Sequence, residues 1–248
     1  MHPLVLPRRI TPSNLQLARE LAIAENPRNA GGGIANGHRQ KRSHGTVGKL
    51  WQPGRTLWVS FLGTPDRRLK TGIFDLACQW LDLSDANLYL DLTHDNDPTA
   101  QIRVRTGRSL ARNESYVGTD ALTATAETMN LNVQPGDASF EHVVLHEFGH
   151  ALGAEHEHQH PDAAIPWNMI EVLKQVSESL GWSYQEIMEE MIGTRDDVGL
   201  VKTAYDPTSV MHYAVPQAFT HGDWEVGLNS TLSEKDLAFM RLAYPLDA

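Results

Sequence analysis

Cysteine and long apolar runs are nearly absent from this sequence of 248 residues. Its single cysteine, Cys78, excludes an intrachain disulfide and any metal site built from several thiolates. A membrane span needs roughly 18–20 apolar residues in succession, and no run approaches that length, so we expect no integral membrane segment. Stability must therefore come from core packing, aided at most by a metal bound through histidines.

Basic residues are scarce outside the first quarter of the chain. Residues 1–65 contain nine Lys/Arg and two acidic residues, a net charge of +7, whereas the remainder contains 12 basic and 29 acidic residues, a net charge of −17. Nucleic-acid binding needs concentrated Lys/Arg, so the acidic body argues against nucleic acid as the main partner. The basic segment leaves three contacts open: the acidic body, a membrane surface or RNA. The oligomeric state is left open as well.

The chain divides into a basic arm, residues 1–44, and a body, residues 45–248. Apolar spacing predicts a helix in the arm over residues 11–25, with Ser13 as its N-cap. A glycine-rich linker follows, and then the tetrapeptide Arg-Gln-Lys-Arg that ends at Arg42, which has the form of a dibasic processing site. The arm is therefore a candidate inhibitory pro-segment that is cut near Arg42.

In the body, predicted strands come first and predicted helices follow, which is typical of an α+β fold in one domain. Alternating, β-branched and aromatic residues predict strands over residues 56–62, 87–92, 101–106 and 123–133. Apolar spacings of three and four predict helices over residues 66–83, 140–153, 168–180, 184–192 and 234–243. Cys78 falls inside the first of these helices, where we interpret it as a small packing residue.

The most informative segment is a histidine motif. His146 and His150 are four residues apart, so on a helix both imidazoles project from one face toward a single ion. Glu147 stands beside that face, where its carboxylate can accept a proton from a metal-bound water. Gly153 tolerates positive φ, so the helix can end there and turn His156 inward as a third ligand. Three histidines leave an open position for water, which is typical of catalytic zinc.

This motif, His-Glu-x-x-His-x-x-Gly-x-x-His, resembles the metzincin zinc signature. Downstream, Ser209-Val-Met211-His-Tyr213 resembles the Ser-x-Met-His-Tyr turn of the astacin family, as does Glu157 directly after the third histidine. Residues 143–167 are most similar to microbial astacin-like peptidases. The likeness covers about residues 45–248.

The resemblance implies a metzincin-like α+β fold and one catalytic zinc ion. It implies a mixed twisted sheet with the active-site helix in an N-terminal subdomain, about residues 45–156, and a mainly helical C-terminal subdomain, about residues 157–248. By the same resemblance, Met211 lies beneath the metal, and Tyr213 is a movable fifth ligand whose hydroxyl stabilises the tetrahedral intermediate. In astacins the residue matching Glu157 bonds the trimmed N-terminus.

Together these features predict a zinc-dependent endopeptidase acting on peptides or proteins. Its metal-bound water would attack the peptide bond, with Glu147 as general base. We expect an edge strand within residues 123–133 to pair with an extended substrate backbone. Two other classes remain open: a zinc hydrolase or amidase acting on a modified-peptide or non-peptide substrate, and a non-catalytic peptide-binding zincin.

Several further histidines weigh less in this interpretation. His158 and His160 allow a second metal, although packing or surface roles are commoner for histidines at this spacing. His142 lies one turn before the motif, where a place on the helix surface is expected. His212 is expected to turn away from the metal.

The sequence also departs from the family pattern. Astacin pro-segments block the zinc with an aspartate, yet the first aspartate here is Asp66, and Cys78 lies in the body, so the arm cannot supply a cysteine either. No signal peptide is visible at the start, which favours a cytoplasmic location, whereas the family resemblance favours secretion. The compartment therefore stays open.

Overall fold

The computed structural model describes residues 5–31, 45–194 and 200–246. A six-stranded mixed sheet has the order β1-β6-β7-β5-β3-β4. Its strands are β1 (Val5–Pro7), β3 (Thr56–Leu62), β4 (Tyr89–Leu92), β5 (Ile102–Thr106), β6 (Asn113–Ser115) and β7 (Met129–Leu131). Four strands from the body run parallel, β6 is antiparallel to β7, and β1 from the arm runs parallel to β6. A separate antiparallel pair joins β2 (Gly45–Thr46) to β8 (Leu200–Val201).

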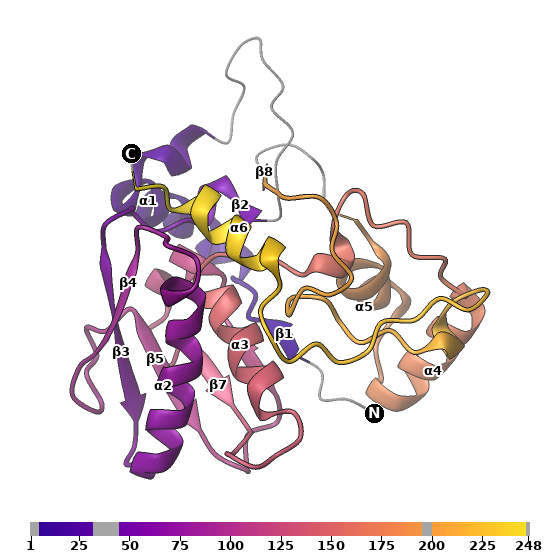
Figure 1. Ribbon diagram of the computed structural model, residues 1–248, viewed down its shortest axis with the longest axis horizontal. Helices are drawn as coiled ribbons and strands as arrows, with labels where there is room; N and C mark the ends of the chain where they lie inside the picture. Colours follow the sequence, from indigo (N-terminus) through magenta and orange to yellow (C-terminus); the bar gives the residue numbers. More distant parts are fainter. Residues whose placement is uncertain (1–4, 32–44, 195–199, 247–248) are drawn as a thin grey trace.

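The helices are α1 (Leu15–Glu25), α2 (Arg67–Asp82), α3 (Phe140–Ala151), α4 (Met169–Leu180), α5 (Tyr184–Ile187) and α6 (Glu234–Ala243). Figure 1 shows α2 and α3 side by side on one face of the sheet. Two buried indoles hold α3 in place: Trp80 Nε1 from α2 donates to the Leu145 carbonyl at 2.9 Å, and Trp51 Nε1 from the segment before β3 donates to the Ala151 carbonyl at 2.8 Å. The main core therefore encloses α3 from several sides. Among the described residues, no helix has both the length and the apolar character to cross a membrane.

A second, smaller core lies between α4, α5 and the π-helical turn that follows α5. Its buried members are Val172, Val176, Ile187 and Met191. The last helix, α6, returns to the larger part and packs against α2 (Figure 1), where Tyr244 donates its hydroxyl hydrogen to the Leu152 carbonyl at 2.7 Å. The expected architecture, a sheet with the active-site helix followed by a mainly helical part, is confirmed.

One expected strand is shorter than predicted, and its predicted edge position is wrong. Within residues 123–133 only β7 is a strand, and it lies between β6 and β5 rather than at an edge. The preceding carbonyls of Ala124 and Ala126 accept hydrogen bonds from the guanidinium of Arg103, so they are not available to a ladder. The strand beside the arm is instead β6, which sequence reasoning missed because it has three residues.

The arm packs against the body rather than lying apart from it. Buried Asn26 donates through Nδ2 to the carbonyls of Leu50 and Trp51, and buried Asn29 donates to the Leu50 carbonyl at 2.9 Å. Helix α1 starts after a 3-10 turn (Pro12–Asn14), so the expected N-cap at Ser13 is wrong. The tetrapeptide that ends at Arg42 lies outside the described residues.

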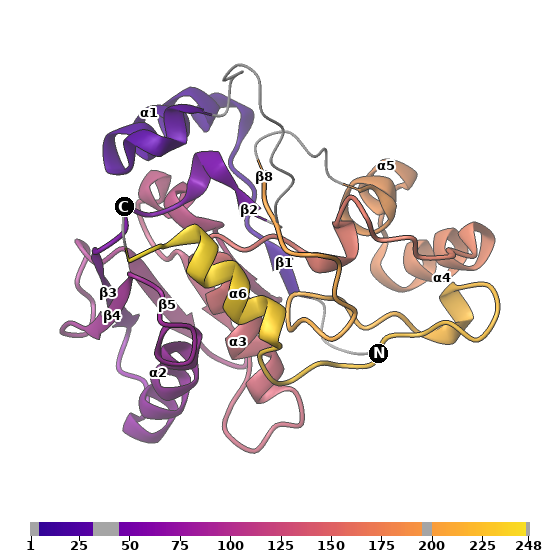
Figure 2. The ribbon, with the colours of Figure 1, turned by 45° about the horizontal axis from the view of Figure 1, so that its top comes forward.

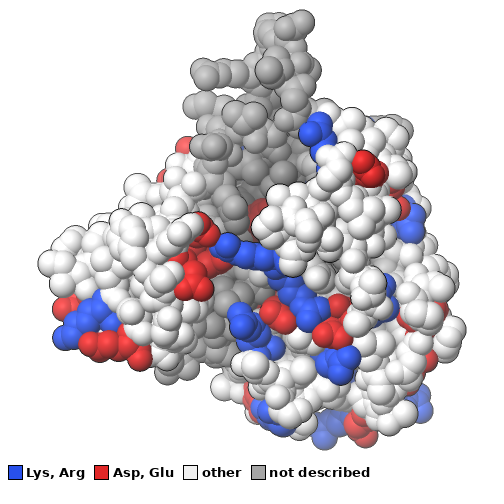
Figure 3. Space-filling view, turned by 180° about the vertical axis from the view of Figure 1, so that it is seen from behind, with Lys and Arg blue, Asp and Glu red and all other residues white. Residues whose placement is uncertain are grey.

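The first strand of the arm lies between the two parts of the molecule. Figure 2 shows β1 with α3 on one side and the α4–α5 part on the other. Strand β1 contacts α3 as well as its ladder partner β6. Seen from behind, the molecule carries basic and acidic side chains next to one another along the hollow between its two parts (Figure 3).

Candidate metal centre and active site

Helix α3 places two imidazoles of the predicted site on one face. The rings of His146 and His150 have centroids 4.8 Å apart, and both side chains are fully buried. His146 Nδ1 lies 2.9 Å from the Val210 carbonyl and His150 Nδ1 lies 2.8 Å from the Ala154 carbonyl. A carbonyl only accepts hydrogen bonds, so each Nδ1 carries the hydrogen and each Nε2 keeps its lone pair. Burial also lowers the pKa of His146 well below its usual value, which favours the neutral ligand form.

The turn at Gly153 brings the third histidine to the same point. Gly153 has φ +96°, and a Cβ there would lie 2.8 Å from Leu50 Cδ2, so both conformation and space require glycine. After this turn, His156 Nε2 lies 3.1 Å from His150 Nε2. Tetrahedral zinc with Zn–N bonds of about 2.0–2.1 Å holds its nitrogens about 3.3 Å apart.

The donor set passes a further test for a metal. The candidate ligand atoms of the three histidines all lie within 4.8 Å of one another. Among the described residues, His146 Nε2 is buried and finds no hydrogen-bond partner. Three buried ring nitrogens with their lone pairs turned toward one point destabilise the folded protein unless a cation binds between them. The residues therefore fit a zinc ion.

Glu147 is the second unusual group of the site. Its side chain is 0% exposed, and neither carboxylate oxygen has a hydrogen-bond partner among the described residues. Burial raises its pKa well above the usual value, and the charge of Glu114 adds to this effect. A carboxylate without partners in the interior destabilises the fold, so its presence beside three imidazoles indicates a functional role.

The methionine turn lies directly below α3. A Cβ at Gly149 would overlap Met211 Sδ and lie 2.8 Å from Trp80 Cζ2, so this glycine lets the thioether approach the helix backbone. Met211 is buried, as the resemblance implies. Sequence reasoning missed Gly149, although a glycine within a helix of buried residues is itself a signal of close packing.

Asp236 fixes the methionine turn and was also missed. Its carboxylate accepts hydrogen bonds from Ser209 Oγ at 2.6 Å and from the backbone N–H of Val210 at 3.0 Å. The same carboxylate completes a capping box with Ser233 at the start of α6. Glu157 binds the turn from the other side, since its N–H donates to the Met211 carbonyl at 3.0 Å. Its buried carboxylate accepts from the Asp206 N–H at 2.8 Å.

Tyr213 lies beside the third histidine. Its ring centroid is 4.3 Å from that of His156 and 4.2 Å from that of His158, with which it stacks. Burial, together with the charge of Glu147, raises the pKa of Tyr213 well above its usual value. Its phenol therefore keeps its proton and can donate a hydrogen bond.

The other histidines near the site bond within the protein. His212 turns to Tyr205, whose hydroxyl lies 2.8 Å from its Nε2, and burial lowers the pKa of His212 to about 4. His158 Nε2 lies 3.0 Å from the Glu190 carbonyl, and His160 Nε2 lies 3.1 Å from the Thr203 carbonyl. The surface position expected for His142 is wrong, because its ring is buried and its Nδ1 donates to the Asn229 carbonyl at 2.7 Å. Within the described residues, the only group of three or more His, Cys, Asp or Glu that could hold a metal is the one on α3 and its turn.

Comparison with known proteins agrees with this geometry. Residues 100–244 match the model of the peptidase family described as Astacin. A structure of myroilysin is 31% identical, with a TM-score of 0.74, covering 82% of this chain and 99% of that one. A second myroilysin structure is 32% identical, with a TM-score of 0.56, covering 79% of this chain and 86% of that one.

A more distant likeness concerns the fold alone. High choriolytic enzyme 1, a hatching enzyme zinc-protease from the medaka fish Oryzias latipes, is 15% identical with a TM-score of 0.54, covering 84% of this chain and 98% of that one. No curated protein matches the sequence. The family match over most of the body, joined to the three converging histidines, shows that the chain belongs to the astacin family of peptidases and is a zinc metalloendopeptidase.

Proposed function

We propose that this protein cuts peptide bonds within polypeptides using one catalytic zinc ion and Glu147 as general base. His146, His150 and His156 would hold the ion through their Nε2 atoms. A zinc ion in such a site polarises the scissile carbonyl and lowers the pKa of a water molecule toward about 7. The observation that carries the proposal is the buried carboxylate of Glu147, which has no hydrogen-bond partner among the described residues. Glu147 directly follows His146 in α3, and its charge acts on Tyr213, whose ring centroid is 4.3 Å from that of His156.

Two side chains would handle the protons and the developing charge. Both oxygens of Glu147 are available to accept a proton from the attacking water and to deliver it to the leaving amine. The phenol of Tyr213, kept protonated by burial, would donate a hydrogen bond to the oxyanion. Met211 and Asp236 act only by positioning, because they touch the helix and the turn rather than the reacting atoms.

The test is mass-spectrometric detection of cleavage products from an unfolded protein. The zinc-loaded chain, tested after it has been cut near Arg42, is compared with Glu147→Ala, and with Glu141→Ala as a control, since Glu141 is exposed in the first turn of the same helix. Many cuts by the parent and the control, lost with Glu147→Ala, would support the proposal. Equal cutting by all three would contradict the role of Glu147. No cuts in unfolded protein, with turnover of a modified peptide or a non-peptide amide, would favour the hydrolase or amidase alternative.

We further propose that the arm keeps the full chain latent until it is cut near Arg42. Strand β1 takes the ladder position on β6 beside α3, where an extended substrate would otherwise lie. Arg9 forms ion pairs with Glu189 and Glu190 on the opposite part of the molecule, so the arm spans both walls of the hollow. Cleavage near Arg42 should then raise activity, and equal activity before and after cleavage would contradict the idea.

A further inference from the structure

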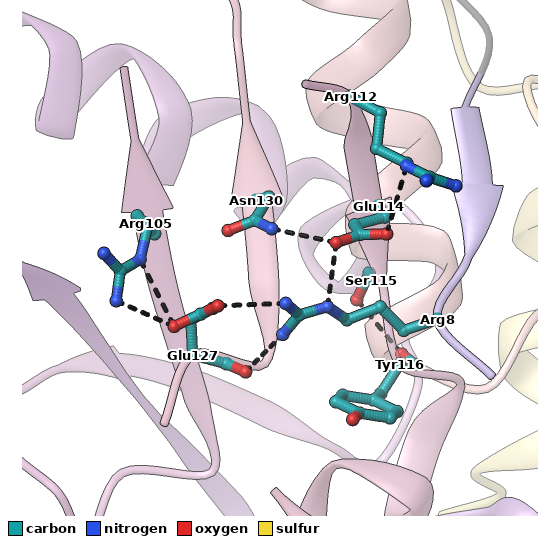
Figure 4. Close-up of polar contacts among 8 residues, drawn as sticks. All are labelled: Arg8, Arg105, Arg112, Glu114, Ser115, Tyr116, Glu127 and Asn130. Atoms are coloured by element: carbon teal, nitrogen blue, oxygen red, sulfur yellow. Dashed lines mark hydrogen bonds and ion pairs between the residues drawn. The ribbon is translucent and has the colours of Figure 1, made fainter. Parts of the chain in front are cut away.

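Arg8, in the arm directly after β1, occupies an acidic pocket on the body. Its Nε donates to Glu114 Oε1 at 3.0 Å, its Nη2 to Glu127 Oε1 at 2.9 Å, and its Nη1 to the Glu127 carbonyl at 2.5 Å (Figure 4). The guanidinium also lies over the ring of Tyr116, 5.5 Å from its centroid. Only 19% of the Arg8 side chain is exposed, so this contact is largely removed from water.

The body builds this pocket from its own residues. Asn130 Nδ2 donates to Glu114 Oε1 at 2.9 Å, and Arg105 donates to Glu127 Oε2 at 2.8 Å. Each carboxylate is therefore oriented by residues of the body, independently of the arm. Figure 4 shows both acids pointing toward the guanidinium from neighbouring segments. Burial alone would raise the pKa of Glu127, but hydrogen bonds from its own backbone, Arg8 and Arg105 outweigh it and hold the pKa at about 2.

The pocket lies where a peptide strand is already seen to bind. Leu6 is in register with Glu114, and the N–H of Arg8 donates to the Ser115 carbonyl at 2.7 Å. Without β1, β6 would be the edge of the sheet next to α3. An exposed edge recruits an extended peptide through its main chain, and nearby pockets select the side chains.

The shape of the pocket favours arginine over lysine. Two carboxylates, a backbone carbonyl and an aromatic face surround one planar group, and a guanidinium offers its donors in a fixed fork that matches them. A hollow of about 670 Å³ continues from Glu114 and Glu127 toward Glu186 and Glu190 on the opposite part. Arg112 also lines the hollow, with its Nε 3.9 Å from Glu114 Oε2, so four glutamates face one arginine of the body there. The hollow therefore has room and net negative charge for a side chain that arrives with a substrate.

We propose that Glu114 and Glu127 form a specificity subsite for an arginine side chain of a peptide substrate laid along β6, and that Arg8 occupies it as a built-in substitute. This inference rests on the proposed endopeptidase activity. It predicts that the enzyme prefers arginine at one fixed distance from the bond it cuts. It also predicts that Arg8 and the substrate compete for the same carboxylates.

The experiment uses the zinc-loaded chain carrying Arg8→Gln and cut near Arg42, so that both the pocket and the edge of β6 are open to substrate in every sample. Peptides that the chain cuts are resynthesised with arginine, lysine or citrulline at each position around the cut bond, citrulline being a neutral analogue of the same shape. At one position, kcat/KM for arginine should exceed that for citrulline about tenfold, the loss expected when a charge-assisted hydrogen bond becomes neutral. Lysine should fall between them.

Added variants then assign the preference to the two acids. Glu114→Gln or Glu127→Gln, each combined with Arg8→Gln, should bring arginine and citrulline to within about twofold, while Glu178→Gln, an exposed change on α4, should preserve the preference. Arg8→Gln alone should also raise cleavage by the uncut chain relative to the parent, and Arg19→Gln, at an exposed position on α1 of the arm, should not.

The outcomes separate the subsite from the activity. Cleavage with no arginine preference at any position, or with a preference that survives both glutamine substitutions, would overturn the subsite and leave the endopeptidase intact. Absence of cleavage by every variant, Arg8→Gln included, would contradict the proposed function and the subsite with it.

Discussion

Replacing Gly153 with alanine tests how the chain turns from α3 to the third histidine. Two costs add at this position: a backbone at φ +96° that alanine rarely adopts, and a Cβ placed 2.8 Å from Leu50 Cδ2 and 3.4 Å from the Tyr244 hydroxyl oxygen. A strained backbone costs about 1–3 kcal/mol. Leu50 is buried, so moving the end of its side chain adds about 1–2 kcal/mol.

Gly136→Ala is the matched control. Gly136 has a similar φ of +99°, but its Cβ would meet nothing within 4 Å, so it carries the backbone cost alone. Denaturant unfolding of both variants should show Gly153→Ala less stable than Gly136→Ala by about 1–2 kcal/mol. Zinc retention against a chelator should fall for Gly153→Ala alone, because only that turn positions His156. Equal unfolding midpoints and equal zinc retention would refute this reasoning.

Three further predictions concern the methionine turn and the pocket that holds Arg8. Met211→Ala should lower the free energy of unfolding by about 2–5 kcal/mol, whereas Met211→Leu should cost less than about 1.5 kcal/mol, as denaturant titration would show. Asp236→Ala should cost about 3 kcal/mol in the same assay, because Ser209 Oγ and the Val210 N–H lose their charged partner. Glu127 has a folded pKa of about 2 against a usual 4.5, so its stabilisation, at most about 3 kcal/mol, is complete above pH 4.5 and is lost as the pH falls toward 2. Glu127→Gln should therefore lose stability less steeply over that window, and an unchanged slope would contradict the assignment.

The cluster of three histidines was predictable because its signal is local. His146, Glu147 and His150 share one helix, and Gly153 lies close enough in sequence to predict the turn that carries His156. The long helices were predictable for the same reason, since apolar residues at steps of three and four mark a buried face. The structure brings these groups together as expected.

The features that the sequence did not predict depend on contacts between segments that are distant in sequence. Strands β1 and β6 have three residues each, too few for an alternating pattern to emerge. Residues 123–127 are β-compatible, yet Arg103 binds the carbonyls of Ala124 and Ala126, an outcome that no local pattern reveals. Asp236 shows only as part of a helix cap in the sequence, and its bonds to the methionine turn arise from tertiary packing.

The most direct test is cleavage activity measured as zinc is added stepwise to the metal-free chain after it has been cut near Arg42. Activity should rise in proportion to bound zinc and reach its plateau at one ion per chain. Glu147→Gln should bind one ion and stay inactive, because the three histidines remain and only the base is lost. Activity that persists without zinc, or that returns in the zinc-loaded Glu147→Gln chain, would contradict this mechanism.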